Sequence, residues 1–158
     1  LSRRFGLNST MYSVKFPFPS FLLLFDHRET EYNLEQISVA ENLHFNMVWT
    51  AILLSIHQNH FSEEQYAGAQ VFYAPFAGRK MFAEMLQTSM IRVLNPGSKR
   101  AIKSADGIYL MQRINAPGIL VECGFLSNHE EEARLRSHEY QCKLSAVIVC
   151  TYLDYLKT

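Results

Sequence analysis

The sequence has few cysteines, and they are not arranged as a framework. There are three in 158 residues, and so small and odd a number argues against a disulfide-rich scaffold. No two of them form a CxxC pair, which argues against a zinc site built on thiolates. Cys142 and Cys150 would lie two turns apart on a predicted helix, too far for a disulfide.

Long hydrophobic runs are also lacking. No apolar run reaches the ~20 residues that a membrane-spanning helix needs. The longest candidate, residues 16–25 ("FPFPSFLLLF"), holds two prolines. Basic residues precede it as in a signal peptide, but polar "DHRETE" follows it where a small-residue cleavage site would stand. We therefore predict no membrane span and no clear signal peptide in this chain.

An excess of charge of either sign is absent as well. Fifteen basic and fifteen acidic residues balance, which argues against a dedicated nucleic-acid binder. The basic patch "SKRAIK", residues 98–103, is interpreted as a solvated loop rather than a phosphate track. Hydrophobic residues make up 48% and charged residues 19% of the chain, so it can bury a core and fold as one domain.

What is present is an alternation of short apolar runs and amphipathic segments. The apolar runs predict strands at residues 20–25, 51–56, 69–73, 105–111 and 118–121. Helical spacing predicts helices at residues 34–48, 80–94, 128–136 and 137–156, while residues 1–19 show no period. The last helix carries one apolar stripe, formed by Leu144, Val147, Ile148, Thr151, Tyr152 and Tyr155. The pattern predicts an α/β fold, a single domain whose largely parallel or mixed sheet has helices on both faces.

Two polar residues stand where these strands are predicted to end. His57 follows the run 51–56, and Glu122 follows the run 118–121. The carboxyl ends of parallel strands share one sheet edge, which is where open α/β sheets bind ligands. An imidazole and a carboxylate there suit a metal site or an acid/base pair. The spacing alone is also met by a histidine at a loop start and a glutamate that caps a helix.

The motifs "LLSIHQNHF", "GAQVFY" and "GILVECGFLSNHEEEARLRSHEYQCKLSAVI" resemble the zinc-dependent N-acetylmuramoyl-L-alanine amidases of the type-3 family. The nearest likeness is to sporulation-type amidases of spore-forming Firmicutes. The segment "RETEYNLEQISVAENL" is similar too, so the resemblance covers roughly residues 26–156. It implies a peptidoglycan hydrolase that acts outside the cytoplasm, at the cell wall, on the amide between N-acetylmuramic acid and L-alanine.

The resemblance also implies roles for single residues. In the family two His and one Glu hold zinc; His57 matches the second His, and Glu122 matches the catalytic glutamate, which is not a ligand. Zinc with three protein ligands keeps an open position for water, lowers its pKa towards ~7 and polarises the carbonyl. Glu122 would accept the proton of this water and pass it to the leaving amine. Apart from the resemblance, Asn59 is a candidate substrate-binding residue, with a role in forming the turn as the alternative.

Other family features have no counterpart here. The sequence lacks a "GHGG"-like turn with the first zinc His and lacks a matching ligand Glu. We therefore divide the chain into an atypical N-terminal segment, residues 1–25, and an N-terminally incomplete amidase-like domain, residues 26–158. The alternative function is an inactive amidase-like fragment, or a wall- or partner-binding module without a complete zinc site. An activating protein partner of unknown identity is a further candidate partner. A Ser or Cys nucleophile is disfavoured because no G-x-S-x-G motif exists and Cys123 has no identified base.

Overall fold

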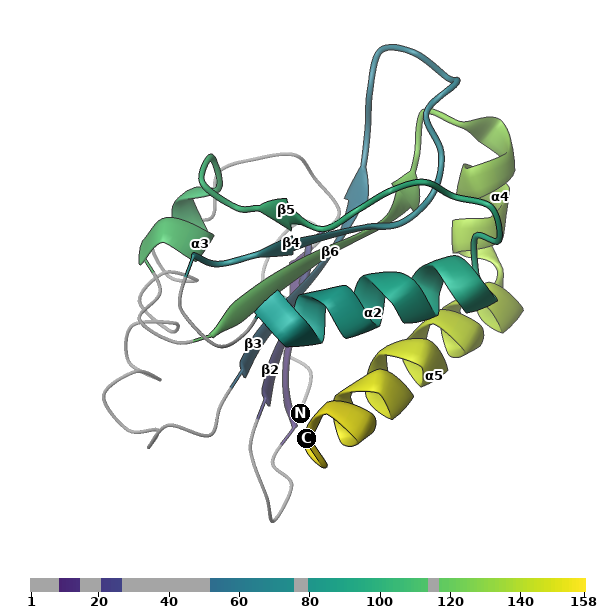
Figure 1. The fold of residues 1–158 in the computed structure, drawn as a ribbon. Coiled ribbons are helices and arrows are strands. Elements are labelled where there is room, and N and C mark those ends of the chain that lie inside the picture. Colours follow the sequence, from purple (N-terminus) through teal and green to yellow (C-terminus); the bar gives the residue numbers. More distant parts are fainter. Residues whose placement is uncertain (1–8, 15–20, 27–51, 76–79, 114–116) are drawn as a thin grey trace.

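The computed structural model describes residues 9–14, 21–26, 52–75, 80–113 and 117–158. Within them, six strands form one sheet in the order β1-β2-β3-β6-β4-β5 (Figure 1). The strands are β1 Ser9–Val14, β2 Phe21–Asp26, β3 Ile52–Asn59, β4 Gln70–Tyr73, β5 Lys103–Ser104 and β6 Gly118–Phe125. The helices are α2 Lys80–Val93, α3 Tyr109–Arg113, α4 His129–Arg136 and α5 His138–Tyr155.

The sheet is mixed. Its centre is parallel, because β3 pairs in parallel with both β2 and β6. Strand β4 then runs antiparallel to β6, and β1 runs antiparallel to β2. The predicted α/β domain with a mixed sheet is therefore confirmed. The proposed boundary between residues 25 and 26 stays a prediction.

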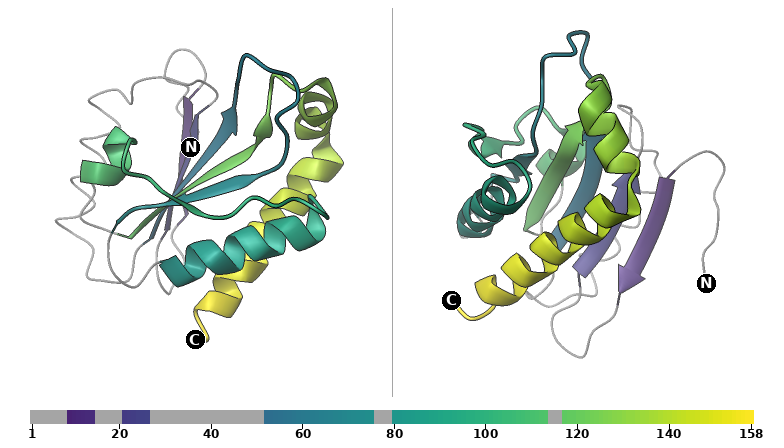
Figure 2. Two further views of the ribbon diagram at one scale, coloured as in Figure 1. Left: turned by 45° about the horizontal axis from the view of Figure 1, so that its top comes forward. Right: turned by 90° about the vertical axis from the view of Figure 1, so that its right-hand side faces the viewer.

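One face of the sheet carries the main core. Alternate residues of β3 and β6, among them Leu54, Val121 and Cys123, point to this face, because side chains alternate along a strand. Helices α2 and α5 lie side by side across it (Figure 2). All six residues of the predicted stripe on the last helix are buried, as expected. Among the described residues, no helix is both long and apolar enough to cross a membrane.

The buried face of α2 differs from the predicted one. The spacing favours Phe82, Met85, Leu86, Ser89 and Val93, whereas the buried residues are Phe82, Ala83, Leu86, Gln87 and Met90. Gln87 is drawn inward because its side-chain amide completes the hydrogen bonds of β4. It accepts from the Val71 N–H at 2.8 Å and donates to the Ala69 carbonyl at 3.1 Å. Hydrophobic spacing does not predict the burial of Gln87, because the backbone groups that it bonds belong to a strand distant in sequence.

Three other expectations need correction or lie outside the described residues. The predicted strand 105–111 is wrong: β5 is only two residues long, a turn follows at Asp106, and α3 begins at Tyr109. The Ser104 hydroxyl donates to the Asp106 carboxylate at 2.8 Å, a local bond that favours the turn. Residues 1–19, expected to be irregular, include β1. The predicted helix 34–48 lies outside the described residues.

The start of α4 is fixed by two side chains with different tasks. Asn128 is the N-cap and accepts from the backbone N–H groups of Glu130 and Glu131. The carboxylate of Glu131, which is only 2% exposed, does not return to its own N-cap as in a capping box. Its Oε2 accepts from Gly68 N–H and Phe125 N–H, each at 2.9 Å, and Arg134 pairs with its Oε1 at 3.0 Å. Glu131 therefore ties α4 to the ends of β4 and β6.

Gly124 makes room for this carboxylate. Its φ of +156° is rarely adopted by residues with a side chain. A Cβ at this position would meet Glu131 Oε2 at 3.0 Å and Leu135 Cδ1 at 3.3 Å. The glycine that follows Cys123 in the motif "VECGFLSN" is therefore explained by packing: a side chain there would collide with residues of α4.

We predict that Glu131→Leu lowers the free energy of unfolding by about 2–4 kcal/mol, since it leaves two buried N–H groups without an acceptor. Glu131→Gln keeps one carbonyl oxygen for those groups and should cost less. Urea unfolding measures both, with Glu130→Gln, an exposed change in the same helical turn, as the control. Equal stability of Glu131→Leu and the control would contradict this account.

The three cysteines should differ in reactivity. Cys123 is buried in the core, whereas Cys142 and Cys150 are exposed. Burial raises the pKa of the Cys123 thiol far above its ordinary value, and the Glu122 carboxylate raises it further, so the thiol stays protonated. We expect a thiol reagent to modify two cysteines quickly in the folded chain and the third only after unfolding. Fast modification of all three in the native state would contradict the placement.

Candidate functional site

His57 and Glu122 lie side by side in the sheet. They are Cα partners in the parallel pair of β3 and β6. Neighbouring strands are about 4.8 Å apart, and partners in register point to the same face of the sheet. Both side chains therefore share the face opposite to α2 and α5. The sequence predicts that each residue comes directly after its strand, and this is wrong. Both strands continue past the pair, β3 to Asn59 and β6 to Phe125.

The surroundings of His57 hold its ring in place. His57 is 9% exposed, and its Nε2 lies 2.6 Å from the Ser55 hydroxyl. Ser55 is two residues earlier on the same strand face and is fully buried. Directly after His57 the register between β3 and β6 shifts, a bulge-like irregularity. Such shifts occur preferentially beside active sites, where they redirect side chains.

Gln70 extends this pair into a row of three residues. It is the partner of Glu122 in the antiparallel pair of β4 and β6, so it stands on the same face. Its side chain donates to the Ala101 carbonyl and accepts from Arg100 Nη1 at 3.2 Å. The row His57, Glu122, Gln70 therefore crosses three adjacent strands.

Aromatic side chains border this end of the sheet. Phe61 and Tyr66, both on the loop between β3 and β4, pack edge to face with ring centroids 4.8 Å apart. Tyr66 in turn stacks on Phe125 at 6.1 Å, and the guanidinium of Arg100 lies 4.7 Å from the centre of the Phe125 ring. Phe61 and Tyr66 are partly accessible to solvent, so the rim combines apolar rings with a cation.

The other predicted site residues fare differently. Asn59 lies at the end of β3 opposite Phe125, and its backbone carbonyl accepts from Leu126 N–H at 2.7 Å; its role in substrate binding stays a prediction. Three further histidines, which the sequence does not single out as site residues, are exposed: His60, His129 and His138.

Ser55, Gln70 and Arg100 were not expected from the sequence. Ser55 could have been found, because residues two apart on a strand share a face. Gln70 and Arg100 could not, since their positions depend on the order of the strands.

The residues described fit a metal in part. The imidazole of His57 is a suitable donor for zinc, and a hydroxyl bonded to one ring nitrogen is a typical supporting contact. Among the described ranges, however, no group of three or more His, Cys, Asp or Glu side chains could hold a metal ion. His27 and His44 lie outside those ranges. A complete zinc site would need donors from outside the described residues.

Comparison with known proteins identifies the family. Residues 25–150 match the family model described as N-acetylmuramoyl-L-alanine amidase. The germination-specific N-acetylmuramoyl-L-alanine amidase of Bacillus subtilis (strain 168) is 37% identical over 105 residues, which cover 66% of this chain and 44% of that protein. The chain spans less than half the length of the curated relatives it matches.

Solved structures of amidases are similar to this chain as well. The CwlD amidase of Clostridioides difficile, in complex with the GerS lipoprotein, superposes with a TM-score of 0.71 at 30% identity, covering 82% of this chain and 73% of that one. The amidase AmiC2 of Nostoc punctiforme gives a TM-score of 0.66 at 25% identity, covering 83% and 71%. The chain therefore belongs to the type-3 N-acetylmuramoyl-L-alanine amidase family and is similar to its germination-specific members.

Proposed function

We propose that this chain hydrolyses the amide between N-acetylmuramic acid and L-alanine in peptidoglycan, on the face of the sheet that holds His57 and Glu122. The observation that carries the proposal is their pairing in register on one face of the sheet. Family membership supplies the reaction, and the pairing supports a site where a base and a metal donor meet one substrate.

Each residue of the pair has a distinct task. Glu122 accepts the proton of the attacking water and delivers it to the amine of L-alanine as the amide breaks. His57 offers a ring nitrogen to zinc, and the Ser55 hydroxyl 2.6 Å from the ring fixes its orientation. Zinc, when bound, would polarise the amide carbonyl and make a nearby water more acidic. Asn59, at the end of the same strand as His57, is proposed to contact the substrate.

The proposed place of action is the cell wall, because the substrate is found there. The solved amidase from Clostridioides difficile is in complex with a lipoprotein. A protein partner of this kind is a proposal for this chain as well. Activity should therefore be measured on the isolated chain and again with cell-envelope extract added.

The alternative is a module that binds the wall without cutting it. The part of the chain that the structure describes holds no complete set of metal ligands, which is the observation in favour of this alternative. Zinc analysis of the purified chain separates the two functions. About one equivalent supports the enzyme, whereas a zinc-free chain that still sediments with peptidoglycan supports the module.

We predict that Glu122→Gln lowers the release of alanine-terminated stem peptides from purified peptidoglycan by about 10²–10⁴-fold, the range that a general base contributes. The amide keeps the size of the side chain but cannot take a proton. New amino termini of alanine are counted by labelling and chromatography.

Glu139→Gln is the matched control, because Glu139 is an exposed carboxylate on α5 and its loss leaves the pair untouched. Chelation followed by zinc should abolish and then restore the wild-type activity. An active Glu122→Gln chain, or a wild-type chain that never releases alanine termini, would reject the proposed function.

A further inference from the structure

Arg100 is held by three contacts to uncharged groups at the border of the site. Its Nε donates to the Ala67 carbonyl at 2.7 Å, and Nη1 donates to the side-chain oxygen of Gln70 at 3.2 Å. The Phe125 ring lies below the guanidinium, 4.7 Å away. The basic patch around Arg100 was interpreted as a solvated loop, but this arginine is half-buried and fixed in orientation.

Arg100 differs from two other arginines, on α4, in how its charge is paired. Arg134 is paired with Glu131, and Arg136 with Glu132. Among the residues that the structure describes, no carboxylate lies within ion-pair distance of Arg100. A guanidinium has five N–H donors in a planar fork that suits a carboxylate. The two hydrogen bonds above leave donors for a ligand.

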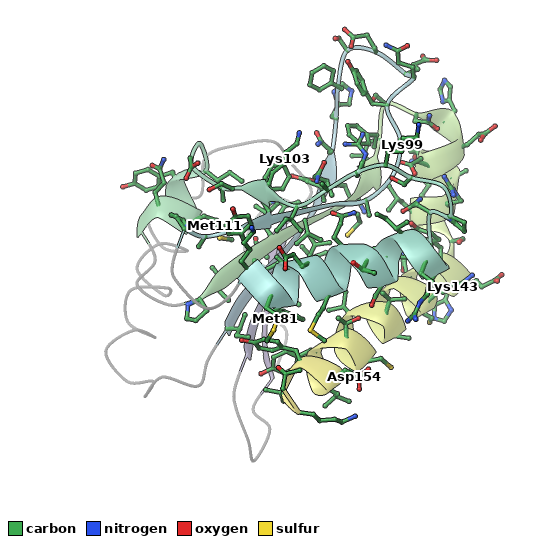
Figure 3. The ribbon with its side chains drawn as sticks, in the orientation of Figure 1. Met81, Lys99, Lys103, Met111, Lys143 and Asp154 are labelled. Carbon is green, nitrogen blue, oxygen red and sulfur yellow. The ribbon has the colours of Figure 1, made fainter. Side chains whose placement is uncertain are left out.

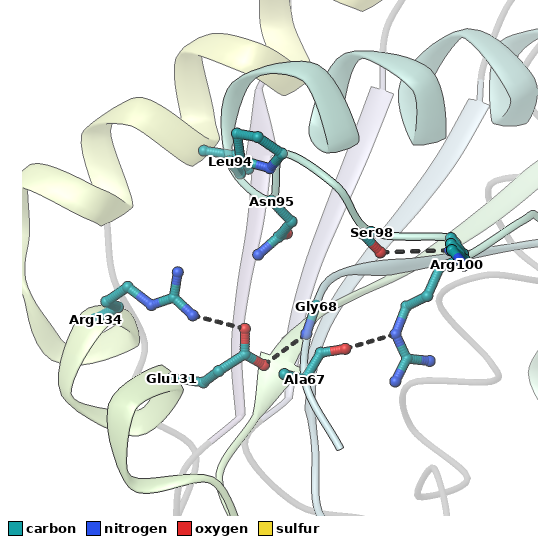
Figure 4. Close-up of a pocket in the computed structure, with 10 residues that line it drawn as sticks. Ala67, Gly68, Leu94, Asn95, Ser98, Arg100, Glu131 and Arg134 are labelled. Atoms are coloured by element: carbon teal, nitrogen blue, oxygen red, sulfur yellow. Dashed lines mark hydrogen bonds and ion pairs between the residues drawn. The ribbon is translucent and has the colours of Figure 1, made fainter. Parts of the chain in front are cut away.

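The surroundings favour an anionic ligand. Arg100 and the exposed Lys99 border an open groove of about 600 Å³, with Glu131 and Arg134 on its opposite side (Figure 4). Because Arg134 neutralises Glu131, the groove keeps an excess of positive charge. Lys99 and Lys103, the latter on β5, lie on the upper side of the molecule in Figure 3, whereas Lys143 lies on α5. A cationic border of this kind attracts negative ligands.

The position of Arg100 relative to the reacting pair matches the length of a short peptide. Gln70 is the direct neighbour of Glu122, with their Cα atoms about 5 Å apart as in any antiparallel pair. Arg100 in turn donates to the Gln70 side chain at 3.2 Å. An extended peptide advances about 3.3–3.6 Å per residue. The residue that follows the alanine at the cut is thus within reach of Arg100.

The geometry points to Arg100 as a specificity-determining residue that binds a free carboxylate on the residue following L-alanine in the stem peptide. Gln70 and Phe125 hold the guanidinium in place, and Lys99 adds attraction from the rim. The inference rests on the proposed function for the identity of the peptide. The recognition of a carboxylate at this position rests on the contacts of Arg100 alone.

The test measures binding with two peptides that differ in one charge. Each contains L-alanine, γ-linked D-glutamate and L-lysine, and the α-carboxylate of the glutamate is either free or amidated. By calorimetry, the wild-type chain should bind the free carboxylate about tenfold more tightly, the factor typical of a charge-assisted hydrogen bond. In Arg100→Gln the two peptides should bind equally, at the affinity of the amidated peptide for wild type.

Lys143→Gln removes the same charge from α5 and should keep the tenfold preference. Thermal unfolding establishes that the variants are folded.

A second measurement needs no variant. On the wild-type chain, added salt should reduce the preference without weakening the binding of the amidated peptide. The inference is overturned if wild type binds both peptides equally or binds neither, if Arg100→Gln keeps the preference, or if salt leaves it unchanged. Cleavage is scored separately, so a chain that shows the preference without releasing alanine rejects the proposed function and not the carboxylate site.

Discussion

The parallel register between β3 and β6 is the constraint on which the site depends. It sets His57 beside Glu122, although the two residues are 65 positions apart along the chain. Because side chains alternate along a strand, a slip of one residue would turn one of the two to the opposite face. Apolar residues of both strands, among them Leu54, Val121 and Cys123, are buried in one core with residues of α2 and α5. Core packing therefore fixes the register of the two strands, and the register places the two side chains of the site together.

The segment that leads into β4 links this site to its rim. Side chains from other elements satisfy its backbone: Asn95 accepts from Ala69 N–H, and Gln87 bonds Ala69 and Val71. Glu131 and Arg100 do the same for Gly68 and Ala67. Buried backbone groups need such partners. As a result, the charged residues around the groove are also structural, and Arg100 is held in place before any ligand arrives.

Elements with a strong hydrophobic period were predictable. The stripe on α5 follows directly from the spacing of its apolar residues, and the apolar runs around Leu54 and Val121 are strands. Weak or short patterns were not predictable. The run 105–111 favours a strand by composition, yet the turn at Asp106 ends β5 and α3 begins at Tyr109. Gln87 is buried because it bonds the backbone of β4, a partner that no local period reveals.

By itself, the sequence determined the α/β class, the family likeness and the two polar residues that interrupt apolar runs. These depend on local composition and spacing, which are present in the chain before it folds. Only the tertiary structure decided that Gln70 completes a row with Glu122 and that Arg100 lies beside it. The order of the strands and the direction of β4 set those contacts, and strand order depends on packing between segments distant in sequence. For that reason the reacting pair could be named from the sequence, whereas the neighbouring Gln70 and its bond to Arg100 could not.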